Sequence, residues 1–271
     1  MISFLLPVVS LLPSPSPSGP RPSQTDLPYP KLPIFAVGLP KSGSTSVLDF
    51  MRCGGFTNAR TSHFSCGKAG GPPMYCGKCA HANFAAKRPL LQGCGEYDVW
   101  AEINYTPAGE RTGECFFPQV SALQQLFDYA PNATWVLPTR PTQHWVDSVV
   151  SWGTMQQDLT DCDLDDLPAG EGNETAALAR FYDAHTAKVR AFARRHASTL
   201  ALVEVEIEHE SAAARAMSAA FAIEAKCWGV SNCKSSCAER AEMQRLVSEE
   251  ASAEVAATMA AAAMAQHSLQ A

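Results

Sequence analysis

The sequence is short of charge, and above all of positive charge. Charged residues make up 18% of its 271 residues, and 21 Lys and Arg against 27 Asp and Glu leave a formal net charge of −6. A protein that binds nucleic acid along its surface needs a broad basic face. The balance therefore argues against nucleic acid as a partner, and it confines any phosphate site to a local group of donors.

The sequence also lacks a long hydrophobic run and an internal repeat. Residues 1–12 are mostly apolar, but no basic residues precede them and they are too short for a membrane-spanning helix of about 20 residues. Residues 13–33 are rich in Pro and Ser, which favours an extended linker. We therefore expect a weak signal peptide or the remnant of a membrane anchor, with its linker, in residues 1–31. We expect a single domain over residues 32–240 and an Ala-rich helical tail over 241–271, and nothing in the pattern indicates an oligomeric state.

Cysteine, in contrast, is abundant. The sequence holds 10 cysteines, many for a reducing compartment, where thiols seldom accumulate without a metal or redox role. Three Asn-x-Thr sequons, at Asn104, Asn132 and Asn173, point in the same direction. These features predict a protein of the secretory pathway, either in the Golgi lumen or secreted.

The spacing of the cysteines allows two interpretations. Cys76 and Cys79 form a C-x-x-C pair with Cys66 and Cys94 nearby, and such a pair supplies two ligands of a tetrahedral zinc site. A structural zinc site normally has a second close pair of ligands, which is missing here, so we favour disulfides. Sequence alone does not fix the pairing. Two pairs are suggested as guesses: Cys162 with Cys227, and Cys233 with Cys237.

Short apolar runs alternate along the chain with segments of helical periodicity. The runs predict strands over residues 32–37, 134–139 and 200–205, and the periodic segments predict helices over 44–51, 118–129, 141–152, 174–196 and 211–223. The Gly- and Cys-rich residues 53–95 and the acidic residues 158–171 predict irregular loops. Strands that alternate with helices indicate the α/β class, with a central parallel sheet covered on both faces in three α/β/α layers.

The segment from Gly38 to Ser46 lies between the first predicted strand and the first predicted helix. Backbone N–H groups and the helix dipole converge on an anion at such a position. The P-loop of nucleotide triphosphatases has its lysine directly after the second glycine, followed by a hydroxyl that binds Mg²⁺. Here Lys41 precedes Gly43, so Mg²⁺ is not implied. The residues expected to bind phosphate are Pro40, Lys41, Ser42, Gly43, Ser44, Thr45 and Ser46.

This loop resembles the PKSG loop of the sulfotransferase family, in which the glycine precedes two hydroxyl residues and the lysine contacts the departing phosphate. Residues 132–140, which end at Arg140, and residues 145–148, which end at Ser148, resemble the strand and helix with which the family holds a 3'-phosphate. The likeness is closest to Golgi-type carbohydrate sulfotransferases and their algal and microbial relatives. It implies a P-loop NTPase-like sulfotransferase fold. It also implies 3'-phosphoadenosine 5'-phosphosulfate (PAPS) as the donor, 3'-phosphoadenosine 5'-phosphate (PAP) as the product, and no metal.

Further residues complete the expected site. The segment around Glu102 is similar to the glutamate-containing segment in which several Golgi-type members place their base, so the resemblance implies Glu102 as the catalytic base. His63 is the alternative, because a neutral imidazole with a pKa near 6.5 accepts a proton at lumenal pH. Trp228 could stack on the adenine or belong to the core, and Lys234 could contact the 3'-phosphate. A glycan on Asn104 would obstruct a cleft at Glu102, so we expect that sequon to be unused.

These observations predict an enzyme that transfers a sulfuryl group to a hydroxyl or amine, with Lys41 stabilising the leaving phosphate. The expected acceptor is a glycan, and a small hydroxylated metabolite or a tyrosine remains an alternative. Two other functions stay open. One is a Mg²⁺-dependent kinase or ATPase, and the other is a secreted, disulfide-rich binding protein that keeps the fold without catalysis.

Overall fold

A five-stranded parallel sheet forms the centre of the computed structural model, which describes residues 30–57, 61–67, 74–106 and 115–229. The strand order is β2-β5-β1-β6-β7, and every neighbouring pair is parallel. The carboxyl ends of all five strands therefore meet at one edge of the sheet. The strands are β1 (Ile34–Ala36), β2 (Thr61–His63), β5 (Val99–Ala101), β6 (Thr134–Thr139) and β7 (Ala201–Glu206).

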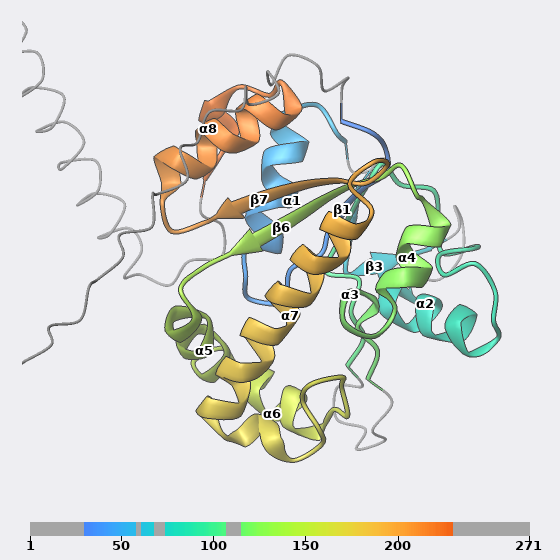
Figure 1. The fold of residues 1–271 in the computed structure, drawn as a ribbon, viewed down its shortest axis with the longest axis vertical. Helices are drawn as coiled ribbons and strands as arrows, with labels where there is room; N and C mark the ends of the chain where they lie inside the picture. The colour runs from blue at the N-terminus through green and yellow to red at the C-terminus, as the bar shows by residue number, and fades with distance from the viewer. Residues whose placement is uncertain (1–29, 58–60, 68–73, 107–114, 230–271) are drawn as a thin grey trace, which may run out of the picture.

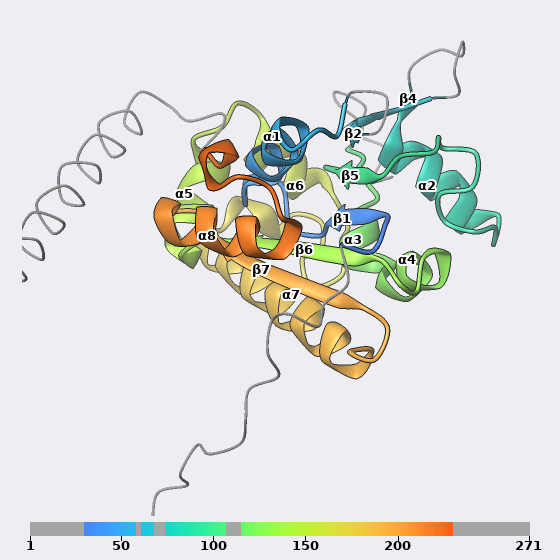
Figure 2. The same ribbon diagram turned by 90° about the horizontal axis from the view of Figure 1, so that it is seen from above.

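Helices cover both faces of this sheet (Figures 1 and 2). On one face, α1 (Ser44–Cys53) and α8 (Glu210–Phe221) bury their apolar side chains against residues such as Val136 of β6. On the other face, α7 (Thr175–Arg195) and α4 (Leu123–Tyr129) pack against Trp135 and Leu137 of the same strand. Successive side chains of a strand point to opposite faces, so β6 contributes to both cores. The predicted α/β class and three α/β/α layers are confirmed.

Smaller elements complete the described part of the fold. A two-stranded antiparallel sheet of β3 and β4 lies beside α2, at the β2 side of the molecule (Figure 2). The helices α5 and α6 form a third core with α7 below the carboxyl edge. These elements are β3 (Ser65–Cys66), β4 (Met74–Tyr75), α2 (Cys76–Ala85), α3 (Pro118–Ser121), α5 (Thr142–Val150), α6 (Met155–Asp161), and the 3-10 turns η3 (Glu171–Asn173) and η4 (Ala225–Cys227).

Three sequence predictions differ from the structure. The helix predicted over 118–129 is divided into α3 and α4 at Ala122, because the apolar spacing marks buried positions without requiring a continuous backbone. Residues 53–95 contain α2, β2, β3 and β4 in addition to loops, and these strands are only two or three residues long. The acidic segment 158–171 begins within α6.

The described residues contain four disulfides, so the predicted use of cysteine in disulfides is confirmed and the zinc interpretation of Cys76 and Cys79 is wrong. The suggested pair Cys162–Cys227 is also wrong, because Cys162 at the end of α6 faces Cys115, while Cys227 faces the end of α1. Cys233 and Cys237 lie outside the described residues. The pairs are Cys53–Cys227, Cys66–Cys76, Cys79–Cys94 and Cys115–Cys162.

Four disulfides indicate folding in an oxidising compartment. Within the described ranges, no helix has both the length and the apolar composition that crossing a membrane requires. The expected sequence segments 1–31 and 241–271 fall almost entirely outside the described residues, as does the end of the expected domain beyond residue 229.

Candidate functional site

The loop between β1 and α1 lies where the sheet changes the direction of its connections. After β1 the chain crosses the face covered by α1, whereas after the neighbouring β6 it crosses the face covered by α7 (Figure 2). In open parallel sheets, ligands bind outside the carboxyl ends of the strands at such a switch point. The fold therefore places the predicted phosphate loop in a position suited to a ligand.

The loop is tight, and its glycines permit that shape. A Cβ atom on Gly38 would lie 2.4 Å from the Ser42 hydroxyl oxygen, and one on Gly43 would lie 2.8 Å from the Ile207 side chain. Gly43 has a φ of 112°, a left-handed value that glycine adopts without strain. The Ser42 hydroxyl is buried and donates a hydrogen bond of 2.5 Å to the Leu39 carbonyl. Ser42 therefore stabilises the loop from inside.

The strand and helix that follow in the sequence hold the loop from outside. The indole Nε1 of Trp145, on α5, donates to the Pro40 carbonyl at 2.8 Å, and Nη1 of Arg140, just after β6, donates to the Lys41 carbonyl at 3.2 Å. The Lys41 ammonium lies 3.0 Å from the centre of the Trp152 ring, a cation–π contact. The two segments that resemble phosphate-binding elements are thus in direct contact.

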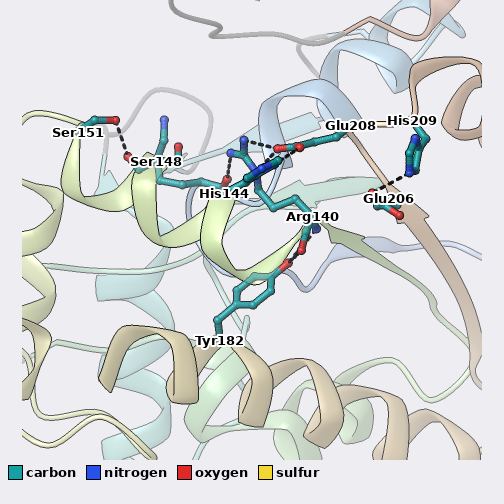
Figure 3. Close-up of polar contacts among 9 residues, drawn as sticks. Arg140, His144, Ser148, Ser151, Tyr182, Glu206, Glu208 and His209 are labelled. Atoms are coloured by element: carbon teal, nitrogen blue, oxygen red, sulfur yellow. Dashed lines mark hydrogen bonds and ion pairs between the residues drawn. The ribbon is translucent and has the colours of Figure 1, made fainter. Parts of the chain in front are cut away.

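Arg140 is held on three sides at the carboxyl edge of the sheet (Figure 3). Its backbone N–H donates to the Tyr182 hydroxyl at 2.9 Å. Its Nε and Nη2 atoms donate to Oε1 of Glu208, at 2.8 and 2.5 Å. The other carboxylate oxygen of Glu208 closely contacts Nδ1 of His144, on α5. Ser148 lies one helical turn beyond His144, so it borders the same group of charges (Figure 3).

The charges around Glu208 keep it ionised. Burial alone would raise the pKa of its carboxyl, but the hydrogen bonds from His144 and Arg140, with their charges, outweigh burial and lower the pKa below its ordinary value. Sequence analysis did not identify Glu208. The available signal was its position three residues beyond the strand predicted over 200–205, which becomes β7, where a polar side chain reaches the ligand edge of a parallel sheet.

A second polar group lies on the other side of the loop, at the ends of β5 and β2. The carboxylate of Glu102 accepts a hydrogen bond of 2.9 Å from the Ser44 hydroxyl through Oε1, and its Oε2 lies 2.8 Å from Nε2 of His63. Glu102 has a left-handed φ of 52°, which turns its side chain toward α1 as the strand ends. Glu102 and His63, the two candidate bases, are therefore in direct contact. Ser44, at the start of α1, connects this pair to the loop.

The pKa of Glu102 reflects this environment. Burial alone would raise it, but the hydrogen bond and charge of His63, the Ser44 hydroxyl and the Lys41 ammonium together lower it below the ordinary carboxyl value. Because Lys41 contributes to this balance, the lysine and the Glu102–His63 pair share one electrostatic environment. The Glu102 carboxylate can therefore stay ionised and act as a proton acceptor.

A pocket of about 540 Å³ opens beside Arg140, between α7 and β7. Its lining is polar and includes Thr139, Arg140, Tyr182, Asp183 and Thr186. Pockets of about 300–1,000 Å³ are typical of sites for small molecules and cofactors. In this pocket Arg140 and Arg190 lie beside the carboxylates of Asp183, Glu204 and Glu206.

Of the remaining predicted site residues, the structure places Trp228, and it lies apart from the loop. Trp228 is buried and packs edge-to-face on Phe50, 5.9 Å between ring centres, at the opposite end of α1 from the loop, which favours its core interpretation. Lys234 lies outside the described residues. Asn104 is only 6% exposed, as expected for a sequon that carries no glycan, whereas Asn132 is exposed. No protein-family model, curated protein or solved structure matches this chain.

Proposed function

We propose that this protein is a sulfotransferase that moves a sulfuryl group from PAPS to a hydroxyl or amine, with a glycan as the preferred acceptor. One observation carries the proposal: a base candidate and two cationic side chains surround the same loop at the carboxyl edge of the sheet. Glu102 lies on one side, Arg140 lies on the other, and Lys41 belongs to the loop itself. Sulfuryl transfer needs both a proton acceptor and a cationic site for the leaving phosphate.

The reaction assigns a task to each side of the loop. The acceptor oxygen forms a bond to sulfur as the bond between sulfur and the 5'-phosphate oxygen breaks, and PAP leaves with that electron pair. Glu102 takes the proton of the acceptor hydroxyl. Lys41 and the N–H groups at the start of α1 stabilise the negative charge that grows on the 5'-phosphate. Arg140 offers a planar fork of donors to the 3'-phosphate.

We place Glu102, not His63, as the base, with His63 as its positioning partner. The lowered pKa keeps Glu102 ionised across the pH range in which a secretory enzyme works. His63 contacts one carboxylate oxygen and Ser44 the other, so the carboxylate has a fixed direction. This arrangement follows the general logic of a proton acceptor held by a second group.

Binding of PAP by isothermal titration calorimetry, without Mg²⁺, tests the nucleotide site. We expect micromolar binding that weakens about tenfold or more in Lys41→Ala and Arg140→Ala, because each loses a charge-assisted contact to phosphate. Arg180→Ala is the matched control, since Arg180 is exposed on α7 and pairs with Glu171. Failure to bind PAP, together with binding of ATP in the presence of Mg²⁺, would support the kinase or ATPase alternative instead.

A turnover assay separates an enzyme from a binding protein. Radiolabelled PAPS with sulfate-free glycosaminoglycans and with a small phenol should give labelled product in the wild type and about 10²–10⁴-fold less in Glu102→Gln. A protein that binds PAP with micromolar affinity but labels no acceptor would fit the non-catalytic binding alternative.

A further inference from the structure

The guanidinium of Arg140 already has an anion. Two of its nitrogens donate to one oxygen of Glu208, and the third donates to the Lys41 carbonyl. Glu208 therefore occupies the edge of the fork formed by Nε and Nη2. A phosphate would compete with the carboxylate for this edge. The carboxylate is planar and the phosphate tetrahedral, but either group can accept hydrogen bonds from both N–H groups of the edge.

The pair is sheltered enough for the competition to matter. The side chains of Arg140 and Glu208 are only 17% and 20% exposed. Water screens charges weakly at partly buried positions, so a phosphate placed beside an ionised Glu208 would be repelled. Either Glu208 must leave Arg140, or the added negative charge must be neutralised.

His144 can serve in both ways, because it can bind Glu208 once that residue leaves Arg140 and it can neutralise the added negative charge by taking up a proton. Its Nδ1 already contacts the second oxygen of Glu208, and its side chain is 47% exposed, so it can exchange protons with solvent (Figure 3). The other charged or titratable groups near Glu208 are Lys41 from the loop, Tyr182 from α7, and the separate pair of Glu206 and His209. His144 contacts the Glu208 oxygen that Arg140 does not use, so it is placed to receive the carboxylate when the contact with Arg140 is lost.

We propose that Glu208 acts as a built-in competitor for the phosphate site, and that a phosphate arriving at Arg140 transfers Glu208 to a protonated His144. Glu208 is then a specificity-determining residue. It weakens the binding of anions that cannot displace it, and it couples the binding of a phosphomonoester to the uptake of up to one proton by His144. The inference rests on the proposed function, because it takes PAP as the phosphate ligand.

Calorimetry of the full-length chain with PAP tests the competition. In Glu208→Gln, which keeps the shape of the side chain and removes its charge, PAP should bind at least about fivefold more tightly than in the wild type. Glu171→Gln is the matched control, because it removes one carboxylate charge from an exposed side chain that pairs with Arg180 and does not line the pocket beside Arg140. The control should bind PAP as the wild type does.

Proton uptake tests the transfer to His144 without any change at Glu208. Titrations at about pH 7 in two buffers of different ionisation heat give the number of protons taken up per PAP. The number of protons taken up per PAP should be positive in the wild type and smaller in His144→Asn. The phosphates of PAP contribute equally in both proteins, so the difference between the two numbers is the contribution of His144. Affinity should therefore fall as pH rises from about 6 to about 8 in the wild type, and fall less in His144→Asn.

The outcomes are distinct. If wild type binds PAP but Glu208→Gln binds no more tightly and His144→Asn takes up as many protons, the inference is wrong and the proposed nucleotide site stands. If neither wild type nor Glu208→Gln binds PAP, the proposed function fails, and this inference fails with it. Circular dichroism checks the folding of each variant, and if Glu208→Gln does not fold, the proton count in wild type and His144→Asn decides.

Discussion

At the scale of single residues, Glu102 shows how neighbours can reverse the effect of burial. A carboxyl group taken out of water normally becomes a weaker acid. Here the His63 imidazole, the Ser44 hydroxyl and the Lys41 ammonium reverse that tendency, so the pKa of Glu102 is lowered although the group is largely enclosed. The charge state of the proposed base therefore depends on three other residues and not on Glu102 alone.

A pH profile of activity tests this dependence. On the acid side of the profile, kcat/KM of the wild type should fall only at pH values below the ordinary carboxyl range, because protonation of Glu102 removes the proton acceptor. In His63→Asn the two largest lowering contributions are lost, burial raises the pKa of Glu102, and the acid limb should move to higher pH. The profile is measured with PAPS and the acceptor identified by turnover.

Two further variants decide which residue is the base. Glu102→Gln should lower kcat by about 10²–10⁴ while PAP binding remains. His81→Asn is the control histidine variant, since His81 stacks on Phe116 away from the pair. If Glu102→Gln keeps most of its activity and His63→Asn loses it at every pH, His63 is the base and Glu102 its partner.

The sequence predicted both members of this pair but not their contact. Glu102 and His63 are 39 positions apart in the printed sequence, and they meet because β5 and β2 are adjacent and parallel. Both strands are three residues long, and Thr61-Ser-His63 carries no apolar alternation, so neither strand has a periodic signal. Glu208 was not predicted for a related reason: it meets Arg140 only because β6 and β7, the strands that precede these two residues, are adjacent and parallel.

At the scale of elements, the longest and most periodic segments were predicted best. The strand over 134–139 has the predicted bounds, and α7 and α8 lie within one to two residues of theirs. These segments bury a complete apolar face, so their apolar residues recur with the period of the helix or strand and the pattern is visible in the sequence. The short strands and the division at Ala122 depend on contacts with distant segments, which no local pattern records.

His185 is an element-scale feature because it joins α7 to β1. Its Nε2 donates to the carbonyl of Val37, the residue before the loop begins, at 2.9 Å. Desolvation by burial lowers the pKa of His185 to about 4, against a hydrogen bond to Val37 that acts in the opposite direction. The histidine is therefore neutral in the folded protein at the pH of the secretory pathway.

This burial predicts a loss of stability in acid. Because the folded pKa is lower than that of an unfolded histidine, the unfolded state binds more protons, and stability rises with pH. The contribution is complete above about pH 6.5 and is lost as pH falls toward 4, by about 3 kcal/mol in all. Urea unfolding at several pH values measures it.

The matched variants are His185→Gln and His209→Gln. His185→Gln keeps a side-chain N–H donor for the Val37 carbonyl and should flatten the acid slope, whereas His209→Gln, at an exposed position, should leave the slope unchanged. An equal slope in wild type and His185→Gln would show that other groups account for the acid sensitivity.

At the scale of the whole molecule, one disulfide joins two segments that are not strands of the central sheet. Cys53 ends α1 and Cys227 lies in η4, after α8, so their bond fastens the first and last described helices of one face together. The two cysteines are 174 positions apart. A link that closes so long a loop restricts the unfolded chain more than a short one does.

Replacing both cysteines with serine should lower the free energy of unfolding by up to about 5 kcal/mol on the chain-entropy model. The double variant avoids a free thiol that could exchange with other disulfides. Urea unfolding under non-reducing conditions measures the change, and PAP binding checks that the loop at the other end of α1 is intact. A loss of less than about 1 kcal/mol would mean that the unfolded chain gains little freedom when this link is absent.

The same long separation sets an order of events during synthesis. At about 5–20 residues per second, the ribosome needs roughly 10–35 s to make the chain between Cys53 and Cys227. During that time Cys53 enters an oxidising compartment together with cysteines that are not its partners, and it must remain reduced or exchange a temporary bond for the native one. Of the four described disulfides it is the last that can form, so α1 is fastened to the segment after α8 only after the other three pairs have been made.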